Sequence, residues 1–439
     1  MANVKIGNLL TRIKDVVEIE DGKEYKRVTI KTKNQGISLR DIENGVNIGT
    51  KKQFRIKKGQ FLLSKIDARY GAFGIVPEEV DDAIITGNFW AYEVNHELIN
   101  IEWLNLFVKS PNFIAICDDA SSGTTNRRYL NEEKFLNYSL SLPSIEEQNY
   151  SVQRYYTLNH KYSSLVAELQ YQQELSNIIR QSILQEAVQG RLVSQDPNDE
   201  PASVLLQKIA QEKELLIKEM KIKKEKPLPL INKDEIPYEL PTGWEWVRLR
   251  DVCYKITDGT HQTPRYTDDG AIFLSAQNVK PFRFMPRNHR FVSYEDYETY
   301  IKQTKPELDD VLLTRVGSNI GESAVIDQNL DFAFYVSLCL IKPCKEFVNP
   351  RYICLWLNSP EGTKKSLSNV LGKGTSQGNL NLALINNFVI SLPPLSEQKR
   401  IVEKVDQLMA LCDELERNTD QSKRDTELLM QSVLQKNLQ

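Results

Sequence analysis

The feature that most constrains the fold of this chain is an internal repeat with a separation of 250 residues. Three segments recur in the same order: FLLSKIDARYG from Phe61 and VLLTRVGSNIG from Val311, SLSLPSIEEQ from Ser139 and VISLPPLSEQ from Val389, and QSILQEAVQ from Gln181 and QSVLQKNLQ from Gln431. Solenoid repeats have far shorter periods of about 20 to 50 residues, so this repeat indicates duplication of a whole domain. Two similar domains in one chain suggest a ligand with two similar halves.

Length and composition indicate a folded protein with more than one domain. With 439 residues, the chain is too long for a single ordinary core, and we expect two domains with connecting elements. Its 41% hydrophobic and 26% charged residues are typical of a soluble protein. No apolar run reaches the length of about 18 residues that a membrane span needs, and MANVKIGNLLTRIK lacks the apolar core of a signal peptide. We therefore expect a cytoplasmic protein.

Cysteines and histidines form no metal-binding or catalytic pattern that we recognise. The six cysteines, which lack a C-x-x-C pair or a nearby histidine, are Cys117, Cys253, Cys339, Cys344, Cys354 and Cys412. The four histidines, none in H-E-x-x-H spacing, are His96, His160, His261 and His289. We expect the cysteines to be reduced and buried, and we predict no metal in this chain.

Charge is unevenly distributed along the chain. The net charge of −3 does not favour DNA binding, because neutralisation of phosphates favours basic domains. Residues 51–70, however, hold seven basic side chains and one acid, which gives this segment a charge of +6. Acidic runs occur in connecting parts, as in DPNDEP from Asp196 and ELERNTD from Glu414. Basic faces on the globular units would remain compatible with DNA.

Each repeated unit combines strand-like and helix-like segments. KRVTI, FLLSKI and FWAYEV are β-branched or aromatic and are separated by Gly, Asn and Asp, which is typical of strands. The apolar residues of IEWLNLFVKSPNF from Ile101 form one helical face, and we expect this helix to end at Ser110 before Pro111. PRYICLWLNSPEG from Pro350 repeats the face. The predicted class is α+β.

A long helix is predicted after each globular unit. Residues 144–189 contain no Gly or Pro, and heptad-spaced apolar residues in both copies predict a coiled-coil interface. The predicted interface consists of Tyr155, Leu158, Tyr162, Leu165, Leu169, Ile179, Ile183, Val405, Leu408, Cys412, Leu415, Leu429 and Val433. Each helix needs a partner, so we expect the two to pack together, and the heptads alone permit a parallel or an antiparallel arrangement. The predicted segments are 1–143 and 238–393 for the domains, 144–190 and 394–439 for the helices, and 191–237 for the linker.

The linker contains a charged segment. Gly190 predicts the end of the first long helix, and we expect a shorter helix from about Ser203 to Lys226. The basic run KIKKEK from Lys221 could contact phosphate, but a solvated helix end, where cations complement the helix dipole, accounts for it better.

We identify no catalytic constellation. The phosphate-binding G-x-x-x-x-G-K-[ST] pattern is absent, and so is the Asn- or Asp-Pro-Pro-aromatic motif of DNA amino-methyltransferases. Carboxylates are numerous, but no pair can be singled out as acid and base. The sequence therefore predicts no catalytic residue.

Polar loops at equivalent positions of the two copies are the candidates for DNA contacts. SSGTTNRRYLN from Ser121 and GKGTSQGNLN from Gly372 are rich in Gly and Thr and lead into matched Leu-Asn pairs. Arg suits guanine, and Asn or Gln suits adenine, although each loop alone could be an ordinary polar turn. DGTHQTPRYTDDG from Asp258 and the residues after the matched strands provide further loops. The predicted DNA-binding residues are Lys65, Arg69, Tyr70, Arg127, Arg128, Tyr129, His261, Gln262, Thr263, Arg265, Tyr266, Arg315, Asn319, Lys373, Thr375, Ser376, Gln377 and Asn379.

Together these features resemble the specificity subunit of type I restriction-modification systems. LPSIEEQ and LPPLSEQ, each at the start of a long helix, resemble the family's junction between a target recognition domain and a conserved spacer helix. QGRLVSQDPNDEPASVLLQKIAQEK, ELPTGWEWVRLRDV and DGTHQTPRYTDDG are also typical of it. The resemblance covers nearly the whole chain but says little about residues 1–60. It implies two pseudo-repeated target recognition domains separated by two long helices packed as an antiparallel coiled coil.

The resemblance also implies a function. Each recognition domain would read one half of a bipartite, asymmetric DNA site, while the helices would set the gap and dock the modification subunits. The implied partners are double-stranded DNA, two modification (methyltransferase) subunits and restriction (motor and nuclease) subunits. S-adenosylmethionine, ATP and Mg are expected on those subunits, and this chain is expected to be non-catalytic and free of cofactors. Two alternatives stay open: a fused DNA methyltransferase or nuclease with an unrecognised site, and a coiled-coil scaffold that binds proteins.

Overall fold

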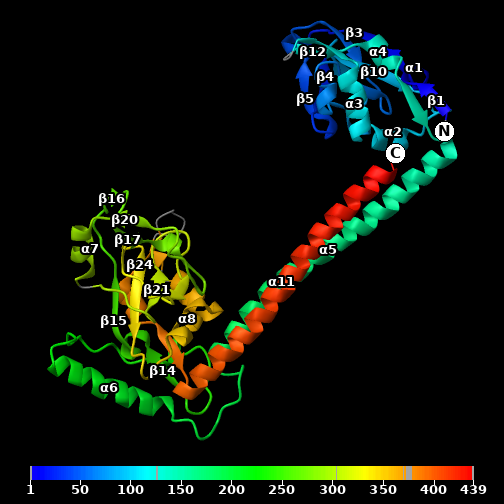
Figure 1. Ribbon diagram of the computed structural model, residues 1–439. Helices are drawn as coiled ribbons and strands as arrows, with labels where there is room; N and C mark the ends of the chain where they lie inside the picture. Colours follow the sequence, from blue (N-terminus) through cyan, green and yellow to red (C-terminus); the bar gives the residue numbers. More distant parts are fainter. Residues whose placement is uncertain (1, 125–126, 303, 369, 372–377, 438–439) are drawn as a thin grey trace. The chain divides into compact units, whose positions relative to one another are not determined.

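The computed structural model describes residues 2–124, 127–302, 304–368, 370–371 and 378–437 (Figure 1). The chain divides into two compact units, residues 1–170 with 421–439 and residues 171–420. Both boundaries fall within long helices, so each unit holds one globular domain together with parts of both helices. Within the described residues, no helix combines the length and the apolar character needed to cross a membrane.

The first domain is built on a four-stranded antiparallel sheet in the order β2-β10-β7-β8. Its strands are β2 (Leu10–Ile13), β7 (Phe61–Ser64), β8 (Phe73–Ile75) and β10 (Phe89–Val94). Successive residues of a strand point to opposite faces. On β7, Phe61 and Leu63 belong to one core cluster and Leu62 to another. The continuous apolar run FLLS is therefore explained by burial on both faces.

A second, five-stranded sheet of the first domain has the order β3-β6-β9-β4-β5. Its strands are β3 (Asp15–Glu18), β4 (Glu24–Lys31), β5 (Gly36–Asn44), β6 (Lys52–Arg55) and β9 (Ile84–Ile85). The pair β4–β9 is parallel and the other pairs are antiparallel. Leu62 and Ala91 of the first sheet share a core cluster with Val28 and Ile85 of the second.

The second domain repeats the four-stranded sheet of the first. Its order is β15-β24-β21-β22, formed by β15 (Cys253–Asp258), β21 (Val311–Thr314), β22 (Ser323–Val325) and β24 (Leu338–Pro343). The central strand β21 pairs antiparallel with β22 and β24, as β7 pairs with β8 and β10. This arrangement confirms the predicted pseudo-repeat of two mixed domains.

The second sheet of the second domain differs from that of the first. It has four strands in the order β16-β20-β17-β23, with β17 and β23 parallel. The strands are β16 (Tyr266–Thr267), β17 (Ala271–Leu274), β20 (Arg290–Val292) and β23 (Phe332–Phe334). Figure 1 shows β16, β17 and β20 at the end of this domain that lies away from β14 (Glu245–Arg248) and α6 (Ala202–Lys218).

Short hairpins and strand pairs complete both domains. The antiparallel pairs are β1 (Ala2–Lys5) with β13 (Ser139–Leu142), β14 with β27 (Val389–Leu392), β11 (Ser121–Thr124) with β12 (Arg127–Leu130), β25 (Val370–Leu371) with β26 (Asn379–Leu380), and β18 (Val279–Lys280) with β19 (Arg283–Phe284). The 3-10 helices are Gly45–Asn47, Ala68–Tyr70, Glu78–Val80, Lys233–Glu235, Leu249–Val252 and Ala276–Asn278.

The predicted helix from Ile101 ends earlier than expected. The short helices are α1 (Ile6–Leu9), α2 (Ile101–Phe107), α3 (Pro111–Asp119), α4 (Glu132–Leu136), α7 (Tyr294–Ile301), α8 (Pro350–Asn358), α9 (Pro360–Ser368) and α10 (Leu382–Asn386). Ser110 is not the end of α2 but the N-cap of α3, and its Oγ accepts a hydrogen bond from Phe113 N at 3.3 Å. Pro111 occupies the first turn of α3, where its missing N–H costs nothing.

The repeated Leu-Pro and Glu-Gln motifs join each domain to its long helix. These helices are α5 (Ile145–Val188) and α11 (Leu395–Asn437). The buried Gln148 donates to the carbonyls of Leu98 and Pro143 and accepts from Asn100 N. Gln398 is equally buried, donates to Pro393 O and accepts from Asn349 N. The repeated glutamine therefore links each helix to the loop before α2 or α8.

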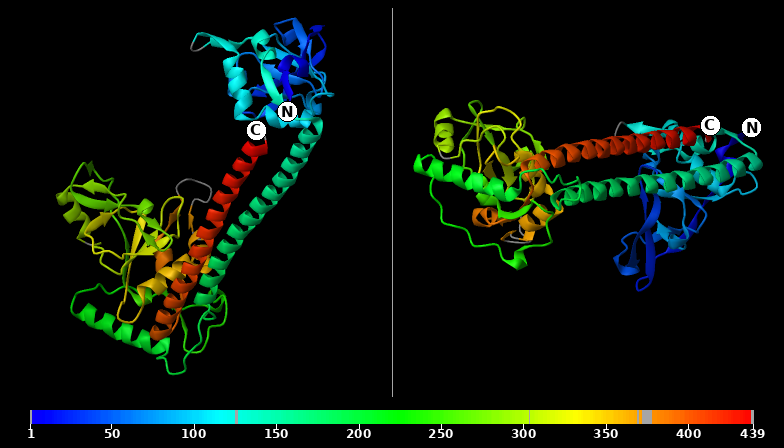
Figure 2. Two further views of the ribbon diagram at one scale, coloured as in Figure 1. Left: turned by 45° about the vertical axis from the view of Figure 1, so that its right-hand side comes forward. Right: turned by 90° about the horizontal axis from the view of Figure 1, so that it is seen from below.

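Within the second unit, the two long helices run antiparallel. Gln173 Nε2 donates to Asp420 Oδ1 at 2.8 Å, and Arg180 Nη2 contacts Asp413 at 2.6 Å and Glu416 at 3.0 Å. As the residue number rises along α5, the residue number of the contacted position on α11 falls, as expected for antiparallel helices. Figure 2 shows the end of α5 beside the start of α11 in both of its views. This finding resolves the orientation that the heptads left open.

The interface between these helices departs from the predicted apolar positions. Leu165, Ile179, Leu415 and Leu429 are exposed, with 44% to 67% of their surface accessible. Val405 and Cys412 are buried as predicted, whereas Ser176 and Thr419 occupy buried positions that we had not predicted. The buried stripe of α5 passes through Gln173, Ser176 and Arg180, three polar residues that were not among the predicted positions. The remaining predicted positions are buried (Leu169) or half-buried (Tyr155, Leu158, Tyr162, Ile183, Leu408), and the side chain of Val433 lies outside the described part of the chain.

The linker helix α6 packs on the second domain and is shorter than predicted. Ala202, Leu205 and Ile209 are buried, and Ala202 and Ile209 belong to the core of this domain. The helix ends at Lys218 rather than Lys226, because Met220 adopts a left-handed conformation with φ of 58°.

Hydrogen bonds join the end of α5 and the start of α11 to the second domain. Ser391 Oγ donates to Val188 O at 2.7 Å. The buried carboxylate of Glu397 accepts from Trp244 Nε1 at 2.9 Å and from Gln195 Nε2 at 3.1 Å. Burial raises the pKa of Glu397.

Candidate nucleic-acid interface

A buried arginine forms hydrogen bonds with two polar loops of the second domain. Arg315 follows β21, and its side chain is only 7% exposed. Its guanidinium donates to Asp258 Oδ2 at 2.9 Å, to Asn379 Oδ1 at 3.0 Å and to Leu380 O at 3.0 Å. Because all these groups are protein atoms, Arg315 positions the loops and has little capacity left for a ligand.

Backbone contacts reinforce this convergence. Leu380 N donates to Arg315 O at 2.8 Å, and Gly317 N donates to Gly378 O at 3.3 Å. Arg315 N donates to the backbone carbonyl of Ser337, and the side-chain Oγ of Ser337 accepts from Ala276 N. Segments far apart in the sequence, around residues 258, 276, 315, 337 and 379, thus meet at one place.

Several predicted residues of the second domain are exposed around this centre. The side chain of His261 is 72% exposed, and its Nε2 lies 3.0 Å from Asp258 Oδ2. The loop that follows exposes Gln262, Thr263, Arg265 and Tyr266. Asn379 is exposed and Asn319 is half-buried. Lys373, Thr375, Ser376 and Gln377 lie outside the described residues. The loop from Asp258 thus connects the Arg315 centre to the second sheet at Tyr266.

The first domain has the same backbone contact with different side chains. Leu130 N donates to Lys65 O at 2.8 Å, which matches the Leu380–Arg315 contact at a separation of 250 residues. Lys65, which stands at the place of Arg315, is half-buried. The arginine of this region is instead Arg12 on β2, whose guanidinium carbon lies 5.2 Å from the Trp90 ring centroid.

The contacts of Arg12 give the first domain its own polar centre. Its Nη1 contacts Glu132 Oε1 at 3.4 Å, and Tyr92 Oη donates to the same oxygen at 3.1 Å. Burial lowers the pKa of Arg12 and raises the pKa of Tyr92. The two domains therefore place their arginine on different strands of the same sheet.

The other predicted residues of the first domain are divided between structural and exposed roles. Arg128 Nη1 pairs with Asp118 Oδ1 at 2.9 Å, and its Nη2 donates to the carbonyls of Asp118 and Ser121. Arg69 lies over the Tyr70 ring at 4.6 Å. Tyr70 and Tyr129 expose 55% and 44% of their surface. The side chain of Arg127 is not among those that the structure describes.

The positive charge of segment 51–70 is partly neutralised in the folded domain by nearby acidic side chains. Lys51 pairs with Asp21 at 2.6 Å, Lys58 with Glu78 at 3.2 Å, and Lys57 with Asp82 at 2.5 Å. The hydrogen bond to Asp82 raises the pKa of Lys57. Three of the seven basic side chains are thus balanced by acids from elsewhere in the domain, which the charge of the segment alone could not reveal.

Sequence inspection missed three polar residues of this interface. Gln277, Asn288 and Arg290 are exposed beside β16 and β20 in the second domain. The run RNHR from Arg287, placed directly before an apolar strand, could have drawn attention to them. They line a hollow at the second sheet of this domain, which differs from the second sheet of the first domain.

All six cysteines are buried and unpaired, as predicted, and burial raises the pKa of Cys117 to about 12. No group of three or more His, Cys, Asp or Glu side chains in the described ranges could hold a metal ion.

Residues 374–378 read GTSQG, which matches the G-x-S-x-G spacing of a nucleophile elbow, although we predicted no catalytic residue from the sequence. Residues 374–377 lie outside the described part, but the flanking strands β25 and β26 pair antiparallel. An elbow instead requires a strand followed by a helix.

The duplicated fold corresponds to a known family. A family model for the type I restriction modification DNA specificity domain matches residues 8–159 and 241–422, which together span most of the chain. Each match contains one four-stranded sheet with its polar centre. The fold thus defines a protein with two DNA specificity domains, and the chain belongs to the type I restriction-modification specificity family.

Relatives in Escherichia coli are similar over most of this chain. The type I restriction enzyme EcoEI specificity subunit is 27% identical over 389 residues, which cover 76% of this chain and 64% of the relative. The EcoAI specificity subunit is 28% identical over 369 residues, which cover 73% of this chain and 61% of the relative. This chain therefore spans less than two thirds of the length of these two relatives. The EcoBI specificity subunit is 22% identical over 433 residues, which cover 96% of this chain and 83% of the relative.

Two solved structures share the fold. A crystal structure of the HsdS subunit from Thermoanaerobacter tengcongensis superposes with a TM-score of 0.60 at 18% identity, and the match covers 100% of this chain and 96% of that one. A structure from work on complex assembly and conformational transition of the type I R-M system has a TM-score of 0.59 at 18% identity, with 100% and 97% covered. At this identity the similarity concerns the fold alone.

Proposed function

We propose that this chain is the non-catalytic, sequence-specific DNA-recognition subunit of a type I restriction-modification complex. Each domain reads one half of a bipartite, asymmetric site in double-stranded DNA, and the long helices set the gap between the halves. The observation that carries this proposal is the pair of polar centres, at Lys65 and Arg315, built on the same sheet with the same backbone contact but with different side chains. Equal frames with unequal loops suit a target whose halves differ.

The proposal includes two modification (methyltransferase) subunits that dock on the long helices. Exposed apolar residues support it: Tyr171, Leu175 and Ile178 follow one another at helical spacing on α5 and expose 37% to 62% of their surface. On α11, Leu411 and Leu415 expose 61% and 45%. Such a row of apolar side chains on a two-helix assembly favours further helices as partners.

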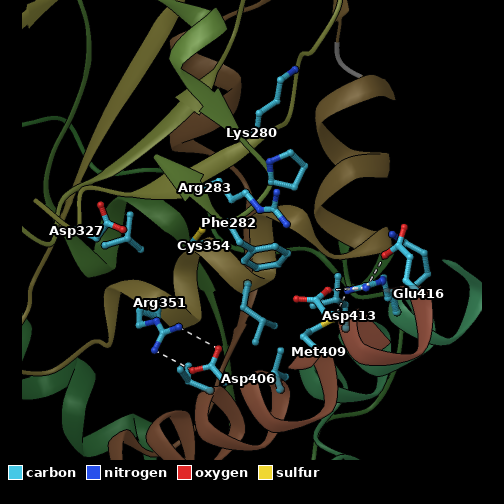
Figure 3. A pocket seen from close by; sticks show the side chains of 18 of the residues that line it. Lys280, Phe282, Arg283, Asp327, Arg351, Cys354, Asp406, Met409, Asp413 and Glu416 are labelled. Carbon is cyan, nitrogen blue, oxygen red and sulfur yellow. Dashed lines mark hydrogen bonds and ion pairs between the residues drawn. The ribbon is translucent and has the colours of Figure 1, made fainter. Parts of the chain in front are cut away.

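A cavity beside the helices provides a second docking feature. It has a volume of about 920 Å3 and lies between the β18–β19 hairpin, α8 and the two long helices within the second unit. Figure 3 shows Phe282 between the hairpin residue Arg283 and Met409 of α11, with the ion pair Arg351–Asp406 at one side. Phe282 is 45% exposed at a φ of 61°, a strained conformation for an aromatic residue. An apolar floor with charged rims suits a segment of a protein partner.

In this proposal the chemistry belongs to other subunits in the cytoplasm. The modification subunits hold S-adenosylmethionine and methylate DNA, and restriction (motor and nuclease) subunits use ATP and Mg. This chain holds none of these cofactors. Micromolar binding of S-adenosylmethionine or ATP by the purified chain would contradict that division.

Exchange of one domain tests the proposed reading of half-sites. Residues 1–143 are replaced by the corresponding domain of a relative, and the chimera is produced with its modification subunits. Sequencing of methylated adenines should show a change in one half-site only. A change in both half-sites would contradict independent reading, methylation by the chain alone would favour a fused enzyme, and binding without sequence preference would favour a protein scaffold.

Substitution of exposed apolar residues tests docking on the helices. Ile178→Ser together with Leu411→Ser should reduce co-purification of the modification subunits without unfolding the chain. Leu230→Ser is the matched control, because Leu230 is an 89% exposed apolar residue of the linker and not of the long helices. Equal yields of complex from all three chains would contradict docking at these residues.

A further inference from the structure

The second domain carries a small hollow on the sheet that distinguishes it from the first domain. It lies between β16, the start of β20 and the 3-10 helix Ala276–Asn278, and has a volume of about 460 Å3. Its polar and aromatic lining includes Tyr266, Asp268, Gln277, Asn288, His289 and Arg290. The loop from Asp258, which contacts Arg315, ends at Tyr266 in the lining of this hollow. Its size suits the edge of a base rather than a protein segment.

Arg290 lies over an aromatic ring at this hollow. Its guanidinium carbon lies 4.7 Å from the ring centroid of Tyr266. Tyr266 pairs with Val292 across β16 and β20, so Arg290 is its diagonal neighbour on the same face. The buried Phe273 contacts the Tyr266 ring edge-on, with centroids 6.1 Å apart. Stacking on a supported ring orients the N–H groups of the guanidinium.

The neighbouring side chains are also oriented in advance. His289 Nδ1 donates to Pro286 O at 2.7 Å, which orients the ring and leaves Nε2 free of this bond. Gln277 Nε2 donates to Asn288 O at 3.3 Å, which leaves Gln277 Oε1 able to accept. These bonds to backbone carbonyls fix both side chains before a ligand arrives.

The charges of the hollow favour a base over a phosphate. In the described part of the chain, Arg290 contacts the protein through the Tyr266 ring and forms no ion pair. Asp268 lines the same hollow, and its carboxylate repels a phosphate. The O6 and N7 acceptors of guanine suit a guanidinium, and the amino group of the paired cytosine suits a carboxylate.

We infer that this hollow reads a G·C pair in the half-site of the second domain, with Arg290 donating to guanine O6 and N7 and Tyr266 positioning Arg290. This inference rests on the proposed function and assigns a specificity-determining residue within it. It requires at least one guanine, on either strand, in that half-site.

Duplexes with single 7-deazaguanine substitutions test the inference, because this base lacks the N7 acceptor. The probe is the methylated target of the assembled complex, with each guanine replaced in turn. For the natural complex, one substitution in the second half-site should weaken binding about 5- to 100-fold. With Arg290→Ala, the substituted and unsubstituted duplexes should bind equally. Arg290→Lys should not restore the difference, because lysine lacks the planar fork.

Matched variants separate reading from general affinity and from folding. Arg287→Ala removes an exposed arginine of the same RNHR run that does not line the hollow, and it should leave the 7-deazaguanine effect unchanged. Tyr266→Phe keeps the stacked ring and should keep the effect, whereas Tyr266→Ala should weaken it. An unchanged 7-deazaguanine effect in Arg290→Ala, or a second half-site without a sensitive guanine, overturns this inference alone. Equal binding of all sequences by the natural complex would instead overturn the proposed function.

Discussion

The first and second domains share a frame but use different side chains at its polar centre. In both, a four-stranded sheet has the same order and the same central strand, β7 or β21. In the second domain, a buried arginine directly after the central strand contacts Asp258. In the first domain the matching residue is Lys65, and Arg12 on an outer strand pairs with Glu132. The comparison teaches that the apolar core preserves the frame while the ion pairs that hold the loops can be rebuilt from other strands.

Replacing the cation at the matched position should separate the two domains most strongly. Arg315→Ala leaves the carboxylate of Asp258 and the carbonyl of Leu380 without their donor, so we expect the second domain to lose about 3 to 5 kcal/mol of stability. Lys65→Ala should cost the first domain less than about 0.5 kcal/mol. Hydrogen exchange, followed separately for peptides of each domain, measures both. Similar losses in the two domains would show that the polar centres are equivalent after all.

Replacing the repeated junction glutamine should affect both domains alike. Gln148→Ala and Gln398→Ala each leave a partly buried backbone N–H and at least one carbonyl unpaired, which costs about 1 to 3 kcal/mol. Urea unfolding of the two variants measures the loss. A loss at only one junction would contradict the equivalence of the two motifs. Gln→Glu at the same positions is the matched control for shape, since it retains an acceptor but loses the donor.

Replacing Arg180 should have a smaller effect on the interface between the helices. Its side chain is 21% exposed and contacts Asp413 and Glu416, so Arg180→Ala should cost about 1 kcal/mol and less at high salt. Ile179→Ala should cost less, because this predicted interface residue is exposed. Thermal unfolding at low and high salt compares them. A greater loss of stability from Ile179→Ala than from Arg180→Ala would support the apolar interface that the heptads predicted.

The smallest expected difference is in the pH dependence of two glutamates at matched positions. Burial raises the pKa of Glu397, so its contribution to stability is complete below the unfolded pKa of about 4.3 and is lost as pH rises through the folded pKa. Hydrogen bonds from Ser144 lower the pKa of the exposed Glu147. Its contribution is present above about pH 4.3 and is lost as pH falls through the folded pKa.

Glutamine substitutions test this opposition. Glu397→Gln should gain stability relative to the natural chain as pH rises above about 4.3. Glu147→Gln should lose stability relative to the natural chain as pH rises from the lowered folded pKa of Glu147 toward about 4.3, with no further change above it. Denaturant midpoints between about pH 3 and pH 7 measure the two slopes. Slopes of the same sign would contradict the different environments of the two junctions.

Some parts of the fold could be read from repeated residues. Both domains bury the central strand, β7 or β21, and the junction glutamine, Gln148 or Gln398. Packing and hydrogen bonding therefore keep the sequences of these segments similar. The helix interface could not be read in the same way. Its buried stripe includes Gln173 and Arg180, whose hydrogen-bond partners lie on the other helix.

Contacts between distant segments also limited the prediction of the candidate interface. The loop from Asp258 and Asn379 were identified as polar and exposed, and the structure places both beside Arg315. Arg315 itself looked like a residue available to DNA, because its partners lie 57 and 64 residues away in the sequence. Arg290 was missed because its stacking on Tyr266 depends on the pairing of β16 with β20.

The sequence by itself determined the duplication, the mixed α+β class, the two long helices and the position of each domain–helix junction. These features depend on local periodicity and on residues that burial keeps alike in both copies. Only the tertiary structure decided the antiparallel orientation in the second unit, the polar stripe between the helices and the structural role of Arg315. The physical reason is that a charged or polar side chain has no fixed role until the fold supplies its partner, whereas an apolar pattern already specifies which face must be buried.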